Sequence, residues 1–288
     1  MSFAETALLG AIAGFTIYLG LPVGRFAHVD DRVRVALAMF SVGILAFIFM
    51  DVTGHGETII AGTLTSFKAH HTSFLHVLGE FALLAAGFTL GTAGISSVEQ
   101  RLRRSQAPAP APIAGAEAGV TLSAPQVAAY HDAAVEARRV ALRTGLTIAV
   151  AIGLHNFAEG LAIGVSAKAG AIGLATVLII GFGLHNATEG FGIVGPLGGV
   201  RPSWGWLGLA GLIGGGPTFV GTLVGYQVHS PALELAFYAL AGGAILYVVG
   251  EIWTGMRRYG HKTLGLYMLA AGFLLGVATD LVVAYGGG

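Results

Sequence analysis

The sequence predicts an all-α integral membrane protein, built as a bundle of eight transmembrane helices. Of the 288 residues, 55% are apolar and only 10% are charged, whereas soluble globular domains carry about 25% charged residues. The mean hydropathy is +0.77. Eight mostly apolar segments also reach the length of about 20 residues that a helix needs to cross a bilayer. Together these observations argue against a soluble fold.

The predicted spans follow one another along the whole chain. They cover residues 4–24, 33–51, 74–95, 141–166, 172–194, 205–228, 232–254 and 263–286. The first segment is predicted to be a span and not a signal peptide, because residues 1–24 have no basic n-region and no small-residue cleavage pattern.

Most links between the spans are short, and the exception is residues 97–138. This link contains the run QAPAPAPIAGAEAG. Pro, Ala and Gly dominate it, so we expect a disordered loop without a core of its own. The chain then divides into residues 1–96 with spans 1–3, the disordered cytoplasmic loop 97–138, residues 139–194 with spans 4 and 5, and residues 195–288 with spans 6–8.

Basic residues mark one side of the predicted bundle. Thirteen of the fifteen Lys and Arg residues lie in or beside the links 1–2, 3–4, 5–6 and 7–8, and only Lys68 and Lys168 lie on the other side. Lys and Arg accumulate in cytoplasmic loops. We therefore expect a multi-pass protein of the cell membrane with both termini outside, in the periplasmic or extracellular space.

Composition also excludes several kinds of function. The chain has no cysteine, which rules out disulfides, thiolate metal sites and cysteine nucleophiles. It has 15 basic and 15 acidic residues. Because the basic residues are distributed as a topology signal and form no patch, nucleic acid is not an expected partner.

The link between spans 2 and 3 and its borders are rich in side chains that can bind a metal ion. These are Asp51, His55, Glu57, His70, His71, His76 and Glu80. One interpretation is a solvated polar loop. The other is an acidic, imidazole-rich vestibule that raises the local concentration of cations.

A repeated motif lies inside two of the apolar segments. Residues 151–164 read AIGLHNFAEGLAIG and residues 181–194 read GFGLHNATEGFGIV, so both contain Gly-Leu-His-Asn, two variable residues and Glu-Gly. Residues three or four apart lie on one face of a helix. Each Glu therefore shares a face with the His and the Asn of its own motif. The short link between spans 4 and 5 makes them antiparallel neighbours, so the two motifs can meet near mid-span.

The chemistry of these motifs predicts a metal site. An ionisable side chain at the bilayer centre costs about 2.5 kcal/mol or more, so it should be paired inside the bundle. A hydrogen-bonded His–Glu latch between helices is one such pairing. Two neutral imidazoles and two carboxylates also balance the charge of one divalent cation, and nitrogen and oxygen ligands favour Zn²⁺, Fe²⁺, Mn²⁺, Co²⁺ or Ni²⁺. The candidate ligands are His155, Asn156, Glu159, His185, Asn186 and Glu189.

These motifs resemble those of the Zrt/Irt-like (ZIP) family of metal transporters, which carry His-Asn-x-x-Glu-Gly in the fourth span and a second His/Glu set in the fifth. The resemblance implies a 3+2+3 arrangement, in which spans 1–3 and 6–8 are inverted repeats around spans 4 and 5. It also implies that the motif residues form the transport site. The expected function is transport of a divalent transition metal into the cytoplasm: zinc, with iron, manganese and cobalt as alternatives.

Three features of the sequence depart from the pattern of this family. Ala158 stands where many members have Pro before the fourth-span Glu, so a kink at that point lacks its usual cause. The long link contains only one histidine, His131, which argues against zinc sensing by this loop. Gly216 precedes Pro217 where binuclear members have a carboxylate, which predicts a single metal ion.

Other polar residues within the predicted spans give weaker signals. Glu251, near the inner end of span 7, is a further candidate metal ligand, because many family members have a His-Glu pair there. It either helps the ion to leave or pairs with Arg257 or Arg258. Asp51 and Asp280 lie toward the outer face of their spans and either guide metal inward or sit in wetted surface.

An intramembrane metal-dependent hydrolase is the alternative function. Such an enzyme needs an open metal position for water and usually a separate general base, and the sequence contains no His-Glu-x-x-His motif. We therefore expect a transporter and not an enzyme. Its expected partners are divalent metal ions and the lipid bilayer, with no cofactor besides the transported ion, and its small-residue helix faces allow a homodimer.

Overall fold

The computed structural model describes residues 1–26, 30–104, 124–168, 170, 172–198, 200–227 and 230–285, and these residues form helices and their connections without a strand. The elements are α1 (Phe3–Phe15), α2 (Ile17–Gly20), η1 (Leu21–Arg25), α3 (Asp31–Lys68), α4 (Phe74–Thr89), η2 (Leu90–Gly94), α5 (Ile95–Arg104), α6 (Ala124–Lys168), α7 (Ile172–Val194), η3 (Gly195–Leu197), α8 (Trp204–Gln227), α9 (Pro231–Arg257) and α10 (Lys262–Tyr285).

Seven helical segments of the described chain are long and apolar enough to cross a membrane, so the chain is a multi-pass membrane protein. They coincide with the predicted spans except the fifth. The predicted fifth span, residues 172–194, coincides with α7, which has 23 residues but is not among the seven. Side chains at 171–178 and 181 lie outside the described residues.

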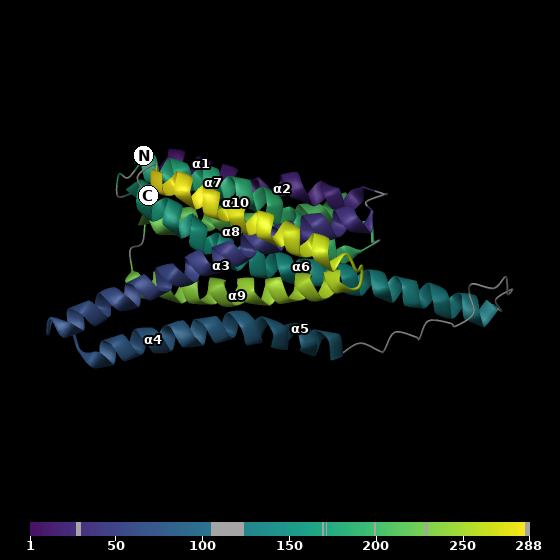
Figure 1. Ribbon diagram of the computed structural model, residues 1–288, viewed down its shortest axis with the longest axis horizontal. Coiled ribbons are helices and arrows are strands. Elements are labelled where there is room, and N and C mark those ends of the chain that lie inside the picture. Colours follow the sequence, from purple (N-terminus) through teal and green to yellow (C-terminus); the bar gives the residue numbers. More distant parts are fainter. Residues whose placement is uncertain are drawn as a thin grey trace.

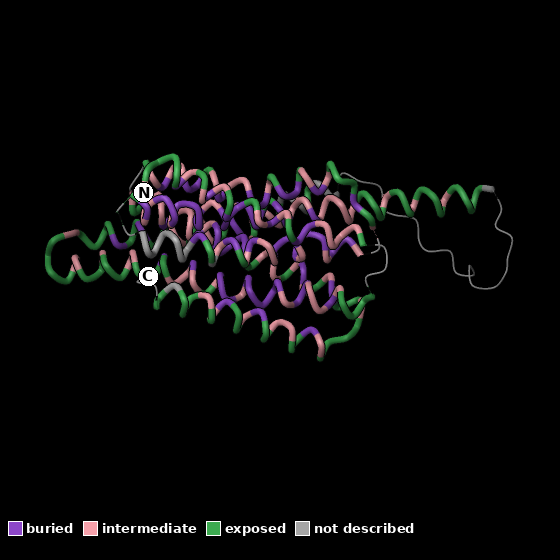
Figure 2. The backbone as a smooth tube through the Cα atoms, turned by 90° about the horizontal axis from the view of Figure 1, so that it is seen from above, coloured by how far each residue is buried: buried purple, intermediate pink, exposed green. Residues whose placement is uncertain are grey.

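The long helices lie side by side along one axis, and the two ends of the chain lie at the same end of the bundle (Figure 1). At that end the hairpin of α3 and α4 projects beyond the other helices. The first part of α6 projects from the opposite end. Figure 2 shows that both projections are largely exposed, whereas buried residues are concentrated in the bundle between them.

Two segments differ from their predicted form. The polar segment 51–80 is not a loop, because α3 continues to Lys68 and α4 begins at Phe74. Three glycines but no proline interrupt the sequence from 52 to 68, so no residue there blocks the helical hydrogen bonds. The ring centroids of Phe67 and Phe74 lie 5.6 Å apart at the hairpin tip.

The segment 97–138, predicted to be disordered, is helical at both its ends. Helix α5 continues to Arg104 and α6 begins at Ala124. The Pro-rich run lies between them, and residues 105–123 lie outside the described chain. Residues 126–138 contain five alanines together with Gln126, Glu136 and Arg138, all good helix formers, and no proline, which explains why they extend the helix of the fourth span.

Close contacts between glycine and backbone bring α6 and α8 together. A methyl group added at Gly160 would lie 2.1 Å from the carbonyl oxygen of Thr218, and one added at Gly221 would lie 2.1 Å from that of Phe157. Such small residues let helices approach until their backbones touch. This packing fixes the position of the motif on α6 relative to α8.

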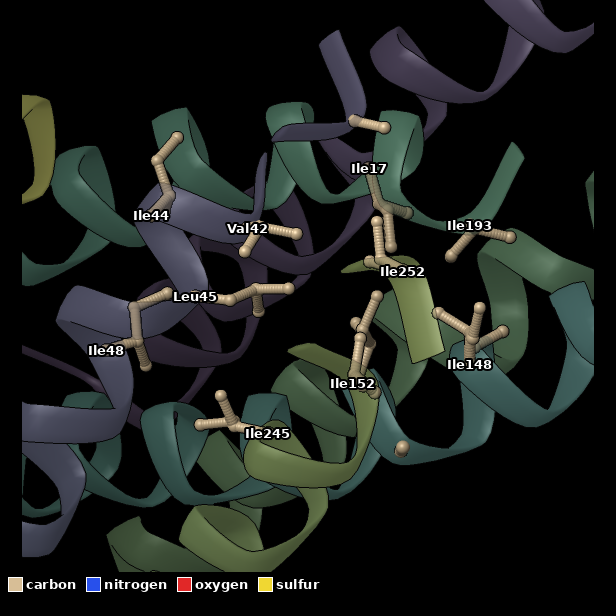
Figure 3. Packing of buried hydrophobic residues seen from close by; sticks show 14 of the residues in the cluster. Ile17, Val42, Ile44, Leu45, Ile48, Ile148, Ile152, Ile193, Ile245 and Ile252 are labelled. Carbon is tan, nitrogen blue, oxygen red and sulfur yellow. The ribbon is translucent and has the colours of Figure 1, made fainter. Parts of the chain in front are cut away.

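Branched aliphatic side chains fill the bundle on the side of the two motifs that faces away from the chain termini. Ile148 and Ile152 of α6, Ile193 of α7 and Ile252 of α9 are all fully buried. Figure 3 shows them packed together with Ile17 of α2. On that side, therefore, the repeated motifs adjoin an apolar, closely packed core.

Candidate metal centre

The two motifs meet across the interface of α6 and α7. The short link from Lys168 to Ile172 makes these helices antiparallel neighbours. Nε2 of His155 lies 2.8 Å from Oε1 of Glu189, and Nε2 of His185 lies 2.5 Å from Oε1 of Glu159. Each histidine therefore contacts the glutamate of the other helix, in a reciprocal pair.

The same side chains converge on one point. Nε2 of His155 also lies 3.6 Å from Oε1 of Glu159 on its own helix. One ligand atom from each of His155, Glu159 and His185 lies within 4.8 Å of the other two, and the two imidazole centroids are 6.5 Å apart. These separations allow one ion between them to bind all three side chains after small side-chain shifts.

The two asparagines are tied to neighbouring helices. Nδ2 of Asn156 donates to the carbonyl oxygen of Gly214 on α8 at 2.9 Å, and to Oε2 of Glu189 at 3.2 Å. Nδ2 of Asn186 donates to the carbonyl oxygen of Ala13 on α1 at 3.1 Å. Asn156 therefore contacts the ligand cluster directly, whereas the amide group of Asn186 is directed to α1.

The cluster contains buried polar atoms that lack a hydrogen-bond partner within the described protein. His155, Asn156, Asn186 and Glu189 are 0% exposed and Glu159 is 4% exposed. The atoms without a hydrogen bond are Nδ1 of His155, Oδ1 of both asparagines and Oε2 of Glu159. Nε2 of His155 and Oε1 of Glu189 lie 2.8 Å apart, but their angles do not make a hydrogen bond. An unsatisfied buried polar atom costs about 1–3 kcal/mol. A bound cation would satisfy several of these lone pairs at once.

A cavity of about 550 Å³ leads from this cluster toward the end of the bundle where the chain termini lie. Glu159 and His185 line its inner part. Further out it is lined by side chains of α3, α9 and α10, with acidic or hydrogen-bonding groups at Asp51, His55, Glu234, Tyr238 and Asp280. A cation could therefore reach the cluster along a path with three carboxylates.

The structure assigns different surroundings to the remaining predicted residues. Asp51 and Asp280 both line this cavity. Glu251 lies on α9 next to the buried Ile252 and, among the described residues, is neither in the ligand cluster nor in the lining of the cavity. Sequence reasoning missed Glu234, whose only signal was a carboxylate in the first turn of a predicted span.

Position 216 does not face the ligand cluster, contrary to the expectation that a carboxylate there would hold a second ion. Within the described part of the chain, a Cβ atom at Gly216 would have only Leu212 within 4 Å, and Leu212 is 55% exposed. The α8 residue that reaches the motifs is Gly214, through its carbonyl oxygen. A carboxylate at 216 would therefore point away from the ligand cluster.

The helices and the cluster together define a multi-pass helical membrane protein with a buried His/Glu site between two of its helices. No model of a known protein family matches the chain. Over 143 residues, or 46% of its length, the chain is 36% identical to "Zinc transporter ZupT" from Clostridium perfringens (strain 13 / Type A). The match spans 48% of that protein. This similarity supports the resemblance to the ZIP family that the two motifs indicate.

Proposed function

We propose that the protein is a ZIP-family transporter that moves zinc, or a related divalent ion such as Fe²⁺, Mn²⁺ or Co²⁺, into the cytoplasm. The observation that supports this proposal best is the reciprocal contact of two histidines and two glutamates in a buried site. With neutral imidazoles, the two carboxylates balance one 2+ charge, which removes much of the cost of burying the ion.

The cavity and the apolar core on its far side support a direction for the movement. The carboxylates of Asp51 and Asp280 line the approach and attract cations. The buried side chains of Ile152 and Ile193 lie within four residues of His155 and Glu189, on the side away from the cavity. This conformation therefore corresponds to a state that is loaded from the side of the termini and closed on the other.

We further propose that α7 is an eighth span and that the helices follow the 3+2+3 arrangement around α6 and α7. The site would then lie near the bilayer midplane. The thirteen Lys and Arg residues in or beside the links 1–2, 3–4, 5–6 and 7–8 support a cytoplasmic position for that end of the bundle, with both termini outside.

Uptake of metal by proteoliposomes of known internal volume tests this function. We expect purified protein to accumulate zinc down its gradient, and a tenfold excess of Co²⁺ or Mn²⁺ to inhibit uptake where Mg²⁺ and Ca²⁺ do not, because the site offers imidazole nitrogen. Equal uptake by empty liposomes would refute transport. Metal-dependent hydrolysis of an added peptide or ester substrate, without accumulation of metal inside the liposomes, would favour the alternative function of an intramembrane hydrolase.

A further inference from the structure

An amphipathic hollow lies at the end of the bundle away from the termini, well separated from the ligand cluster. It has a volume of about 370 Å³ and lies where α3 begins, α9 ends and α10 begins. A second hollow of about 360 Å³ adjoins it and shares His261 and Lys262 with it. Among the described residues, the lining of neither hollow includes α6 or α7.

The floor of the first hollow is apolar. Val35 and Met39 of α3 and Met256 of α9 are buried beneath it, and Trp253 of α9 is half-buried at its side. Gly265 of α10 leaves the floor open, because a methyl group at this position would approach Met39 to 3.2 Å. A hydrocarbon chain would therefore cover this floor more favourably than water does.

The rim of the two hollows carries cationic side chains. Arg32, Arg257 and Lys262 are exposed, and none of them forms an ion pair with another residue of the described part of the chain. Neighbouring arginines differ in this respect: Arg34 contacts Asp31 at 2.7 Å, and Arg258 donates to the carbonyl oxygen of Pro196 at 3.2 Å.

We propose that this hollow binds the headgroup and upper acyl chain of an anionic phospholipid. Its phosphate would lie between Arg257, Lys262 and Arg32, and its acyl chain would cover Val35, Met39 and Trp253. Basic pockets between spans are a known form of lipid-headgroup site, and Trp is favoured at the interface between lipid and water. A free phosphate ion would use the rim alone and would leave the apolar floor uncovered.

Native mass spectrometry of the full-length protein in detergent tests this proposal with phosphatidylglycerol and phosphatidylcholine of the same acyl composition. We expect wild-type protein to retain phosphatidylglycerol in preference to phosphatidylcholine. The double variant Arg257→Gln, Lys262→Gln should bind phosphatidylglycerol about 30-fold more weakly, given the contribution of each basic residue near anionic lipid. The matched control is Arg101→Gln, Arg138→Gln, which removes two exposed arginines from the same end of the bundle, outside the hollow.

The control separates a site from general attraction of basic residues to anionic lipid. If the control variant loses as much phosphatidylglycerol binding as the hollow variant, the proposal is wrong. Displacement of bound phosphatidylglycerol by millimolar inorganic phosphate would also overturn it, because the floor would then contribute nothing. Circular dichroism and size-exclusion profiles establish that each variant is folded.

A second measurement, on wild-type protein and a single conservative variant, tests the proposal even if the Arg257→Gln, Lys262→Gln variant does not fold. Phosphatidylglycerol brominated near the headgroup should quench tryptophan fluorescence more than brominated phosphatidylcholine does. This difference should disappear in Trp253→Phe, because Trp204 and Trp206 lie on α8 and outside the hollow. Equal quenching by the two lipids, or a difference that persists in Trp253→Phe, would contradict the proposal.

Discussion

Nε2 of His155 on α6 lies 2.8 Å from Oε1 of Glu189 on α7, and both side chains are fully buried. His185 and Glu159 form the corresponding contact in the opposite direction. The two halves of the sequence repeat are thus interleaved, and each ligand from one helix faces a ligand from the other. Removing one member of either pair should therefore disturb both helices' contributions to metal binding.

The two glutamates give the most direct test of the site. Replacing Glu159 or Glu189 by Gln keeps the shape of the side chain but removes one negative charge from a buried site that binds a cation. We expect zinc uptake to fall by at least about 10- to 100-fold, the range seen even for partners of metal ligands. Asp132→Asn, at an exposed carboxylate on the projecting part of α6, serves as the control and should transport normally. Wild-type uptake by the Glu159→Gln, Glu189→Gln double variant would show that the transport site lies elsewhere.

The two asparagines should behave differently from each other. Asn156→Ala removes the side-chain donor to the carbonyl oxygen of Gly214 and releases Glu189, whereas Asn186→Ala removes the bond to Ala13. Each loss of a buried partner should destabilise the protein by about 1–3 kcal/mol, seen as a lower melting temperature. Zinc affinity should fall more in Asn156→Ala. Equal affinities in the two variants would show that the contact with Glu189 does not hold this ligand in place.

Acid should weaken metal binding. Protons compete with the cation for imidazole nitrogen and carboxylate oxygen, so the bound fraction must fall as these ligands become protonated. We expect the dissociation constant for zinc to rise steadily from about pH 8 to about pH 5 in equilibrium binding to detergent-solubilised protein. A constant that does not change over this interval would argue against ligation by His155 and His185.

One tightly bound ion per chain is the expected stoichiometry. Two divalent ions would carry four positive charges, and the two glutamates would offset only half of them in a buried site, which is costly in a medium of low dielectric constant. Zinc-edge anomalous scattering from soaked crystals should show one peak between His155 and His185. Because Gly216 faces away from the cluster, Gly216→Glu should leave this single peak unchanged. Two strong peaks about 4 Å apart in wild-type protein would refute the prediction.

The orientation can be tested with single cysteines, because the chain has none of its own. Thr65 on the α3–α4 hairpin and Ala128 on the projecting part of α6 are both exposed and lie at opposite ends of the bundle. In intact cells, a membrane-impermeant maleimide should label Thr65→Cys and not Ala128→Cys. Labelling of Ala128→Cys alone would reverse the proposed topology and the direction of loading.

The sequence by itself determined the class of protein and the residue types of the site. Hydrophobic length defines membrane helices, because a bilayer requires the backbone to satisfy its own hydrogen bonds. The spacing of His155, Asn156 and Glu159 defines one helical face, because 3.6 residues complete a turn. Both properties are local, so they can be predicted without knowledge of neighbouring helices.

Only the tertiary structure decided which groups meet. Spacing along a single helix could not show that His155 contacts Glu189 of α7, that Asn186 bonds to Ala13, or that Gly216 faces away from the site. These contacts depend on the rotation and depth at which two helices pack, and close approaches such as that of Gly160 to Thr218 set both. Helix packing combines side chains from distant parts of the chain, and no single segment encodes that combination.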